Sequence, residues 1–281
     1  MNTARSSDGT AIAFDRSGHG PPVILVVGAF NDRSTGAPLG EVLARRFTVY
    51  NYDRRGRGAS GDVPPYAVAR EIDDLEAIIA EAGGPASVFG FSSGAILALR
   101  GAGRSLPITK LALYEPPLVH GGDNGQPTSG TARLTGSASF KVSDDRPRPP
   151  ADLAAQLAGL VAAGRRGDAV ELFQTKMVNI PVEVVAELRQ ASFWPELEAT
   201  AHTLAYEATI IADVASPADL AASVTVPALV MSGGNSPEWM REGVRALAEA
   251  LANGRYRCLE GQVHDIVPDV MAPVIEEFFG S

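Results

Sequence analysis

Short apolar segments alternate with longer amphipathic ones up to residue 114 and again after residue 224. The run Val23–Val27 is continuous and β-branched, which is typical of a strand buried on both faces of a sheet. The segment Val68–Ala82 instead carries its apolar residues at helical spacing. This alternation predicts an α/β fold with a mostly parallel sheet and crossover helices.

The same patterns predict where the individual elements lie. We expect an edge strand at Ala11–Asp15 and further strands at Val23–Val27, Phe47–Tyr52, Ala86–Phe89, Ile108–Tyr114, Ala228–Ser232 and Tyr256–Leu259. Helices are expected at Leu39–Arg45, Val68–Ala82, Ser93–Arg104, Glu238–Ala252 and Val267–Phe279.

Between these two regions the alternation stops. Pro116–Pro150 is rich in Gly, Ser, Thr, Asp and Pro, and an aperiodic stretch of this length is typical of a lid or a disordered insert. The pattern is then helical over Ala151–Asp213, with separate helices at Ala169–Met177, Val182–Gln190 and Pro195–Ile211. We therefore predict a core of residues 1–117 and 224–281, with residues 118–223 inserted as a helical cap whose residues 120–150 are irregular.

Composition excludes several classes of partner. With 24 basic and 33 acidic residues the net charge is −9, which disfavours binding to nucleic acid or to an anionic membrane. Cys258 is the sole cysteine, so an internal disulfide or a multi-cysteine zinc site is excluded. The segment Met1–Thr10 is polar, and no apolar run approaches the ~18 residues of a membrane span. We expect a cytoplasmic protein that acts on a small molecule, with no nucleic-acid or membrane partner and a homodimer as a candidate assembly.

The motif Gly90–Gly94, of the form Gly-x-Ser-x-Gly, stands between a predicted strand and a predicted helix. A nucleophile presented at a strand end needs a tight turn before the helix, and flanking glycines keep other side chains out of the way. The helix N-terminus stabilises developing negative charge. The plainer alternative is an ordinary helix start with Ser92 or Ser93 as the N-cap.

An acyl-transfer site also needs backbone N–H groups facing the Ser92 hydroxyl. The turn Gly28–Asn31 follows a buried strand and is placed to supply one from Ala29, beside the N–H of Ser93. A glycine that simply ends a strand is the alternative interpretation of Gly28.

His264 is the candidate base among the four histidines. It follows the last predicted strand, at the sheet edge where open α/β sheets bind ligands. His19 lies in an early turn, His120 in the irregular segment, and His202 on a helix of the insert. A loop histidine with no role is the alternative for His264.

These motifs, together with Gly18–Pro22, Asp53–Ser60 and Val226–Pro227, resemble those of the α/β-hydrolase superfamily, particularly its bacterial members with a helical cap. The resemblance covers the chain apart from the segment around Gly121–Lys141. It implies the α/β-hydrolase fold, with residues 118–223 as a cap over the pocket. In this superfamily the Asp53–Ser60 loop is usually scaffold, and its three arginines are otherwise candidates for attracting an anionic substrate.

The resemblance also implies roles for individual residues. Ser92 is the expected nucleophile and His264 the expected base, with Ala29 and Ser93 as oxyanion donors. Phe30 and Phe91 are the expected substrate-binding side chains. A serine rather than an aspartate at position 92 argues against the alkyl-enzyme chemistry of epoxide hydrolases and dehalogenases.

The acid is where the sequence departs from the family pattern. Most members carry an Asp after the strand Ala228–Ser232, and here Ser236 stands in its place. Neither Asn235 nor Ser236 can hold a negative charge against an imidazolium. Glu238 opens a helix, whose N-terminus it would stabilise, and Asp265 adjoins His264 too closely to reach its ring in the required orientation.

Glu115 is the candidate that remains. It directly follows the strand Ile108–Tyr114, and some relatives carry their acid after this strand. Neighbouring strand ends lie about 4.8 Å apart, so its side chain can reach the usual position. A glutamate in a solvated loop, or one bonded to cap backbone, is the alternative.

We therefore expect a cofactor-independent serine hydrolase, with no metal, that acts on an ester, lactone, thioester or related acyl substrate. Ser92, His264 and Glu115 would form its triad. Two alternatives stay open: a lyase, cyclase or isomerase on the same scaffold, and a catalytically silent protein that binds a small molecule.

Overall fold

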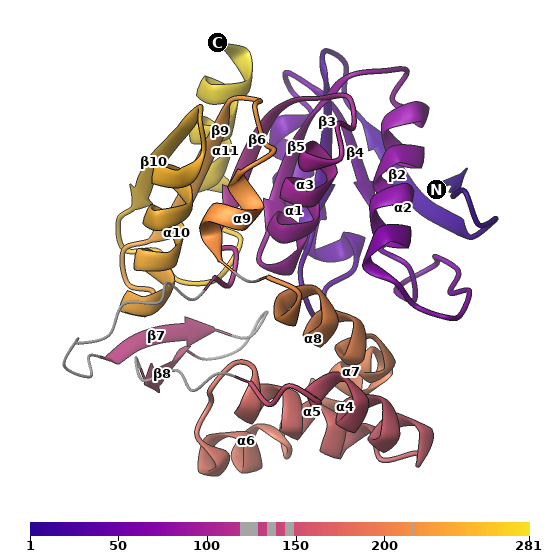
Figure 1. The fold of residues 1–281 in the computed structure, drawn as a ribbon, viewed down its shortest axis with the longest axis vertical. Helices are drawn as coiled ribbons and strands as arrows, with labels where there is room; N and C mark the ends of the chain where they lie inside the picture. Colours follow the sequence, from indigo (N-terminus) through magenta and orange to yellow (C-terminus); the bar gives the residue numbers. More distant parts are fainter. Residues whose placement is uncertain (119–128, 134–138, 144–148, 215) are drawn as a thin grey trace.

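The computed structural model describes the chain except residues 119–128, 134–138, 144–148 and 215. Within the described residues the main sheet has eight strands in the order β1-β2-β4-β3-β5-β6-β9-β10 (Figure 1). Their bounds are β1 Asn2–Arg5, β2 Ala11–Ser17, β3 Pro22–Val26, β4 Thr48–Tyr52, β5 Ala86–Phe91, β6 Ile108–Tyr114, β9 Ala228–Gly233 and β10 Gly254–Leu259. β2 pairs antiparallel with both β1 and β4, and every other neighbouring pair is parallel. The predicted mostly parallel α/β sheet is confirmed.

Helices cover both faces of this sheet. On one face, α1 (Arg33–Leu43) packs against α11 (Pro268–Gly280). On the other face lie α2 (Val68–Glu81), α3 (Ser93–Gly103), α9 (Pro217–Ala221) and α10 (Glu238–Ala250). The central strands are buried on both sides because alternate residues, such as Leu25 and Ile24, enter different apolar clusters. This is why their sequence is a continuous apolar run.

A separate group of helices, named here the helical insert, follows β6 in the chain. It consists of α4 (Leu153–Ala162), α5 (Arg166–Lys176), α6 (Val182–Leu188), α7 (Trp194–Ala199), a 3₁₀ turn at Ala201–Thr203 and α8 (Leu204–Ala212). These elements share an apolar cluster of their own, and α8 also contacts α2 and α3 (Figure 1). The core–cap boundaries at residues 118 and 223 stay a prediction.

Several element predictions were wrong in detail. β2 is not an edge strand, because β1 pairs along its outer side, with Asn2 opposite Phe14. The first helix begins at Arg33, where Asp32 caps it by accepting from Ser34 N at 2.7 Å. Its first turn is polar, so hydrophobic periodicity could not find it.

The helix expected at Pro195–Ile211 is interrupted. The hydroxyls of Thr200 and Thr203 donate to the carbonyls of Leu197 and Thr200, and such bonds compete with helical ones. The chain therefore passes through a 3₁₀ turn between α7 and α8.

The segment 120–150, expected to be irregular, contains a β-hairpin. Strand β7 (Ser129–Arg133) pairs antiparallel with β8 (Ser139–Ser143). β7 is rich in small and polar residues and lacks the apolar alternation by which strands are recognised. The remainder of that segment, including His120, lies outside the described residues.

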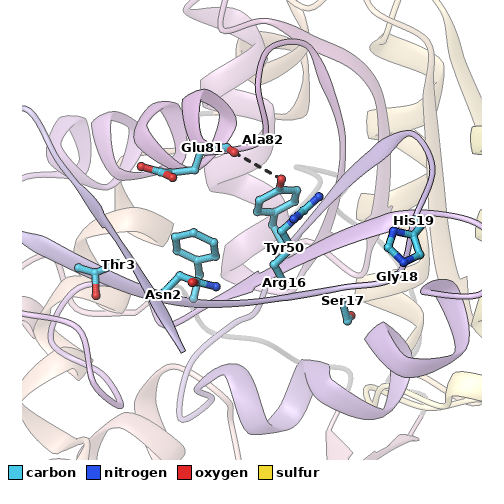
Figure 2. Close-up of a pocket in the computed structure, with 10 residues that line it drawn as sticks. Asn2, Thr3, Arg16, Ser17, Gly18, His19, Tyr50, Glu81 and Ala82 are labelled. Atoms are coloured by element: carbon cyan, nitrogen blue, oxygen red, sulfur yellow. Dashed lines mark hydrogen bonds between the residues drawn. The ribbon is translucent and has the colours of Figure 1, made fainter.

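A hollow of about 850 Å³ is lined by residues of β1 and β2, the turn before β3, Tyr50 of β4 and the end of α2. Polar side chains line it, among them Arg16, His19 and Glu81 (Figure 2). Tyr50 Oη donates to the Glu81 carbonyl at 3.3 Å across it. Its lining includes no residue of the predicted site, so the hollow is separate from that site. Among the helices described, none is both long enough and apolar enough to span a bilayer.

Candidate functional site

Ser92 stands at a strained turn between β5 and α3. Its φ of 55° lies in the left-handed region, which a non-glycine residue rarely adopts. The turn also requires its two flanking glycines. A Cβ on Gly90 would lie 2.6 Å from Ala95 Cα, and one on Gly94 would overlap the Val26 carbonyl oxygen. The predicted strand–turn–helix presentation of Ser92 is therefore what the structure contains.

His264 reaches Ser92 from the loop between β10 and α11. Its Nε2 lies 3.1 Å from Ser92 Oγ. Two contacts hold the ring in place: Tyr114 Oη donates to the neighbouring Val263 carbonyl at 2.6 Å, and the Phe91 ring lies 4.8 Å from the imidazole, centroid to centroid. The imidazole is 22% exposed, so it borders both solvent and the core.

Glu115 lies on the far side of the imidazole from Ser92. Its Oε2 is 2.7 Å from His264 Nδ1, and its Oε1 accepts from the backbone N–H of Gly233 at 2.7 Å. The side chain is fully buried, and its φ of 48° is again left-handed. A buried carboxylate is costly unless it is paired, and both of its oxygens have partners here.

Ser236, at the position where the family carries its acid, is buried and makes no hydrogen bond through Oγ within the described structure. Its hydroxyl lies close to Gly233, since a Cβ there would be 2.8 Å from Ser236 Oγ. The carboxylate of Glu115 thus enters this region from the neighbouring strand, as the strand spacing allows.

Carboxylate, imidazole and hydroxyl therefore form one hydrogen-bonded row. With Nδ1–H donated to Glu115, Nε2 of His264 is left as an acceptor for the Ser92 proton. Such a row can remove a proton from Ser92 while Glu115 stabilises the imidazolium that forms. The structure brings together the three residues that the sequence singled out for this chemistry.

The turn after β3 lies directly against Ser92. A Cβ on Gly28 would be 2.7 Å from Ser92 Cβ, so only glycine permits this approach. The Ala29 carbonyl accepts from Asn31 Nδ2 at 2.6 Å, which fixes the turn. Ser93 opens α3, and the first N–H of a helix has no partner within it. Both expected oxyanion donors thus belong to segments that adjoin Ser92.

The two phenylalanines occupy different surroundings. Phe30 has a left-handed φ of 60° and packs edge-on against Phe173 of α5, with ring centroids 5.5 Å apart. It therefore joins the turn after β3 to the helical insert. Phe91 is 6% exposed and stacks on Tyr114 at 5.9 Å, so it supports the imidazole of His264 from the core side.

The other candidate residues lie elsewhere. His19 is exposed in the turn before β3, and His202 Nε2 contacts the Gly56 carbonyl at 2.7 Å. Asp265 Oδ1 accepts from Ile266 N at 2.8 Å.

The arginines of the loop after β4 are buried, each at most 1% exposed. Arg54 pairs with Glu71 and Glu207, and Arg55 pairs with Asp74. Burial alone would lower the pKa of Arg54, but the charges of Glu207 and Glu71 raise it well above its ordinary value. These cations are already neutralised inside the protein, which agrees with a scaffold role.

Sequence reasoning missed two groups that hold the row together. Gly233 N–H fixes one oxygen of Glu115, and Tyr114 Oη fixes the backbone beside His264. The position of Tyr114 directly before Glu115 could have indicated its role. The role of Gly233 depends on β6 and β9 being neighbours in the sheet, which cannot be deduced from the sequence.

Comparison with known proteins places this chain among hydrolases. The alpha/beta hydrolase family profile matches residues 23–270. The chain is 51% identical to an alpha/beta hydrolase from Sphaerobacter thermophilus DSM 20745, whose crystal structure superposes with a TM-score of 0.85 over 99% of this chain and 100% of that one. A thermophilic esterase from Thermogutta terrifontis shares the fold at 21% identity, with a TM-score of 0.71 over 99% of this chain and 97% of that one.

A curated relative is the uncharacterized hydrolase YraK of Bacillus subtilis (strain 168), 36% identical over 95 residues. That match spans 32% of this chain and 35% of the relative, about a third of its length. With a family profile that covers most of its residues and a sheet of the corresponding architecture, this chain belongs to the alpha/beta hydrolase family.

Proposed function

We propose that this protein is a serine hydrolase of carboxylic acyl substrates. The observation that carries the proposal is the continuous row from Glu115 through His264 to Ser92, with contacts of 2.7 and 3.1 Å. In this role Ser92 Oγ attacks the carbonyl carbon while its proton passes to His264 Nε2. The N–H groups of Ala29 and Ser93 stabilise the oxyanion of the tetrahedral intermediate.

The second half of the cycle uses the same groups. The imidazolium returns its proton to the leaving alcohol or thiol as the tetrahedral intermediate collapses to an acyl-enzyme. Water then attacks the acyl-enzyme, giving its proton to Nε2, and the acid product leaves as Ser92 regains its hydrogen. Glu115 orients the imidazole and stabilises the imidazolium when it forms.

The proposed substrates are esters, lactones or thioesters with a mainly apolar acyl group. Phe30 supports this choice, because it adjoins Ala29 and packs on Phe173, a member of the apolar cluster of the helical insert. The insert carries further leucines, alanines and valines, such as Leu157 and Val170, within that cluster.

A fluorophosphonate probe tests whether Ser92 is activated. Wild-type protein should be phosphonylated stoichiometrically, and Ser92→Ala should not react. Ser236→Ala is the matched control, because it removes a buried hydroxyl outside the row and should leave labelling intact. Equal labelling of Ser92→Ala and wild type would contradict the proposal.

Turnover of p-nitrophenyl esters and lactones of graded chain length then tests hydrolysis. We expect turnover by wild type that is lost in Ser92→Ala. Full labelling without turnover of any ester, lactone or thioester would favour a non-hydrolytic enzyme or a binding protein instead.

A further inference from the structure

Arg54 lies at the junction of three parts of the molecule. It follows β4 in the chain and is fully buried. One edge of its guanidinium is held by Glu71 of α2, through Nε to Oε2 at 2.7 Å and Nη2 to Oε1 at 2.8 Å. This bidentate pairing fixes the plane of the guanidinium.

The remaining nitrogen, Nη1, faces both segments that supply the proposed oxyanion donors. It lies 3.2 Å from the Val27 carbonyl, two residues before Ala29, and 3.3 Å from Ser93 Oγ. Ser93 contributes the other proposed donor through its own backbone N–H. A single nitrogen therefore ties together the two segments whose spacing sets the oxyanion site.

The same nitrogen also contacts the helical insert. Glu207 of α8 accepts from Nη1 at 2.8 Å through Oε1, and this oxygen also accepts from Arg57 Nη2. The other oxygen of Glu207 is buried and has no hydrogen-bond partner within the described structure. Nη1 has two protons for three acceptors, so its contacts with Glu207, Val27 and Ser93 depend on one another.

We propose that Arg54 is a positioning residue, which holds the two oxyanion-donor segments at their working separation and makes that separation sensitive to the placement of α8. The inference rests on the proposed function and deepens it. If Glu207 moves with the insert, the protons of Nη1 redistribute between the Val27 carbonyl and the Ser93 hydroxyl. A change in the position of the insert would thereby alter the oxyanion site, although Glu207 itself does not contact the substrate.

The test is a double-mutant cycle on the partners of Arg54, because replacing Arg54 itself would leave the buried carboxylate of Glu71 without the guanidinium that pairs with it and would strongly destabilise the protein. Ser93→Ala removes the hydroxyl but keeps the backbone N–H, and Glu207→Gln removes the charge but keeps the shape. We expect each to lower kcat for a p-nitrophenyl ester by about 5- to 50-fold, below the 10²–10³ of a lost donor. KM should stay within about twofold, since the effect is on the transition state.

The same variants should weaken inhibition by a trifluoromethyl ketone, whose hemiketal places an oxyanion in the site, by a similar factor. The double variant should depart from the product of the single effects by about threefold or more, as for groups in one network. The matched control is Tyr206→Phe, also on α8, which loses a hydrogen bond to Asp62 and is not a hydrogen-bond partner of Arg54. Its effect should multiply with that of Ser93→Ala.

Multiplicative effects of Ser93→Ala and Glu207→Gln, or unchanged ketone inhibition in both, would overturn the role of Arg54. A purely structural role would lower the melting temperature without separating kcat from KM. Either result can occur in a protein that still hydrolyses esters through Ser92. Full turnover by Ser92→Ala would instead overturn the proposed function, so the two failures are distinguishable.

Discussion

The backbone N–H of Gly233 donates to Glu115 Oε1 at 2.7 Å, across 118 positions of sequence. Gly233 ends β9, and Glu115 follows β6, its neighbour in the sheet. The bond holds the carboxylate of one strand over the end of the next, where the family usually has its own acid. The acid therefore comes from β6 instead of β9, but it still contacts the imidazole of His264. Ser236 occupies the position where the family usually has its acid.

Glu115→Gln should lower kcat by about 10⁴, the size of the loss when a triad carboxylate becomes an amide in a serine protease. The amide would donate toward Nδ1 and favour the wrong imidazole tautomer. Steady-state kinetics on a p-nitrophenyl ester measure this directly. Ser236→Ala serves as the control and should keep kcat close to wild type. Equal, small effects of both changes would remove Glu115 from the mechanism.

Tyr114→Phe should lower kcat by about tenfold, because His264 would lose the fixed backbone beside it. The lost hydrogen bond to the Val263 carbonyl should also cost about 1 kcal/mol of unfolding free energy. Burial and the charge of Glu115 raise the pKa of Tyr114, so the hydroxyl stays a donor at neutral pH. Kinetics combined with urea unfolding check both effects. An unchanged kcat would show that the loop carrying His264 keeps its conformation without this hydrogen bond.

Gly94→Ala should destabilise the protein by about 3 kcal/mol or more, because an added Cβ would overlap the Val26 carbonyl oxygen. Gly159→Ala is the contrasting substitution: it lies exposed on α4 with no atom within 4 Å of an added Cβ. It should stabilise the protein by about 0.5–1 kcal/mol. Urea unfolding of the two variants should move the midpoint in opposite directions.

Stability should fall in acid partly through Glu71. Burial by itself would raise its pKa, but the charge and hydrogen bonds of Arg54 more than offset this and lower it below the ordinary 4.5. A carboxylate with a lowered folded-state pKa contributes stability that is complete above the unfolded value and is lost as the pH falls through the folded value.

The variant Glu71→Gln lacks this titration. Its unfolding free energy should therefore decline less steeply than that of wild type below about pH 4.5. Urea unfolding between pH 7 and pH 3 measures the slopes. Glu76→Gln, at an exposed site of the same helix, should keep the wild-type slope. A wild-type slope in Glu71→Gln would contradict the assignment.

The sequence could predict the elements that carry a strong apolar pattern, whether continuous or periodic. The strand Ile108–Tyr114 was placed with its correct bounds, because it lies in the sheet interior with apolar residues along most of its length. β1 was missed because Asn2–Arg5 is short and polar, and only its pairing with β2 makes it a strand. Pairing of this kind is a long-range property that local periodicity does not carry.

The candidate site was predictable for a different reason. Ser92 and His264 stand at strand ends, and parallel strands bring such ends to one edge. Glu115 is predictable because Asn235 and Ser236 cannot hold a charge, Asp265 adjoins His264 too closely, and Glu238 opens a helix whose N-terminus it would stabilise. Its partner at Gly233 depended on β6 and β9 being neighbours, although the whole helical insert separates them in sequence.

The strand β10 lies at the margin of the sheet, and His264 follows it. Ser92 and Glu115 therefore meet their base only after this outermost strand has docked. During refolding, the rate of fluorophosphonate incorporation should therefore follow the pairing of β10 with β9. The reactivity of the Ser92 hydroxyl would thus measure the fraction of molecules in which β10 has paired and the site is complete.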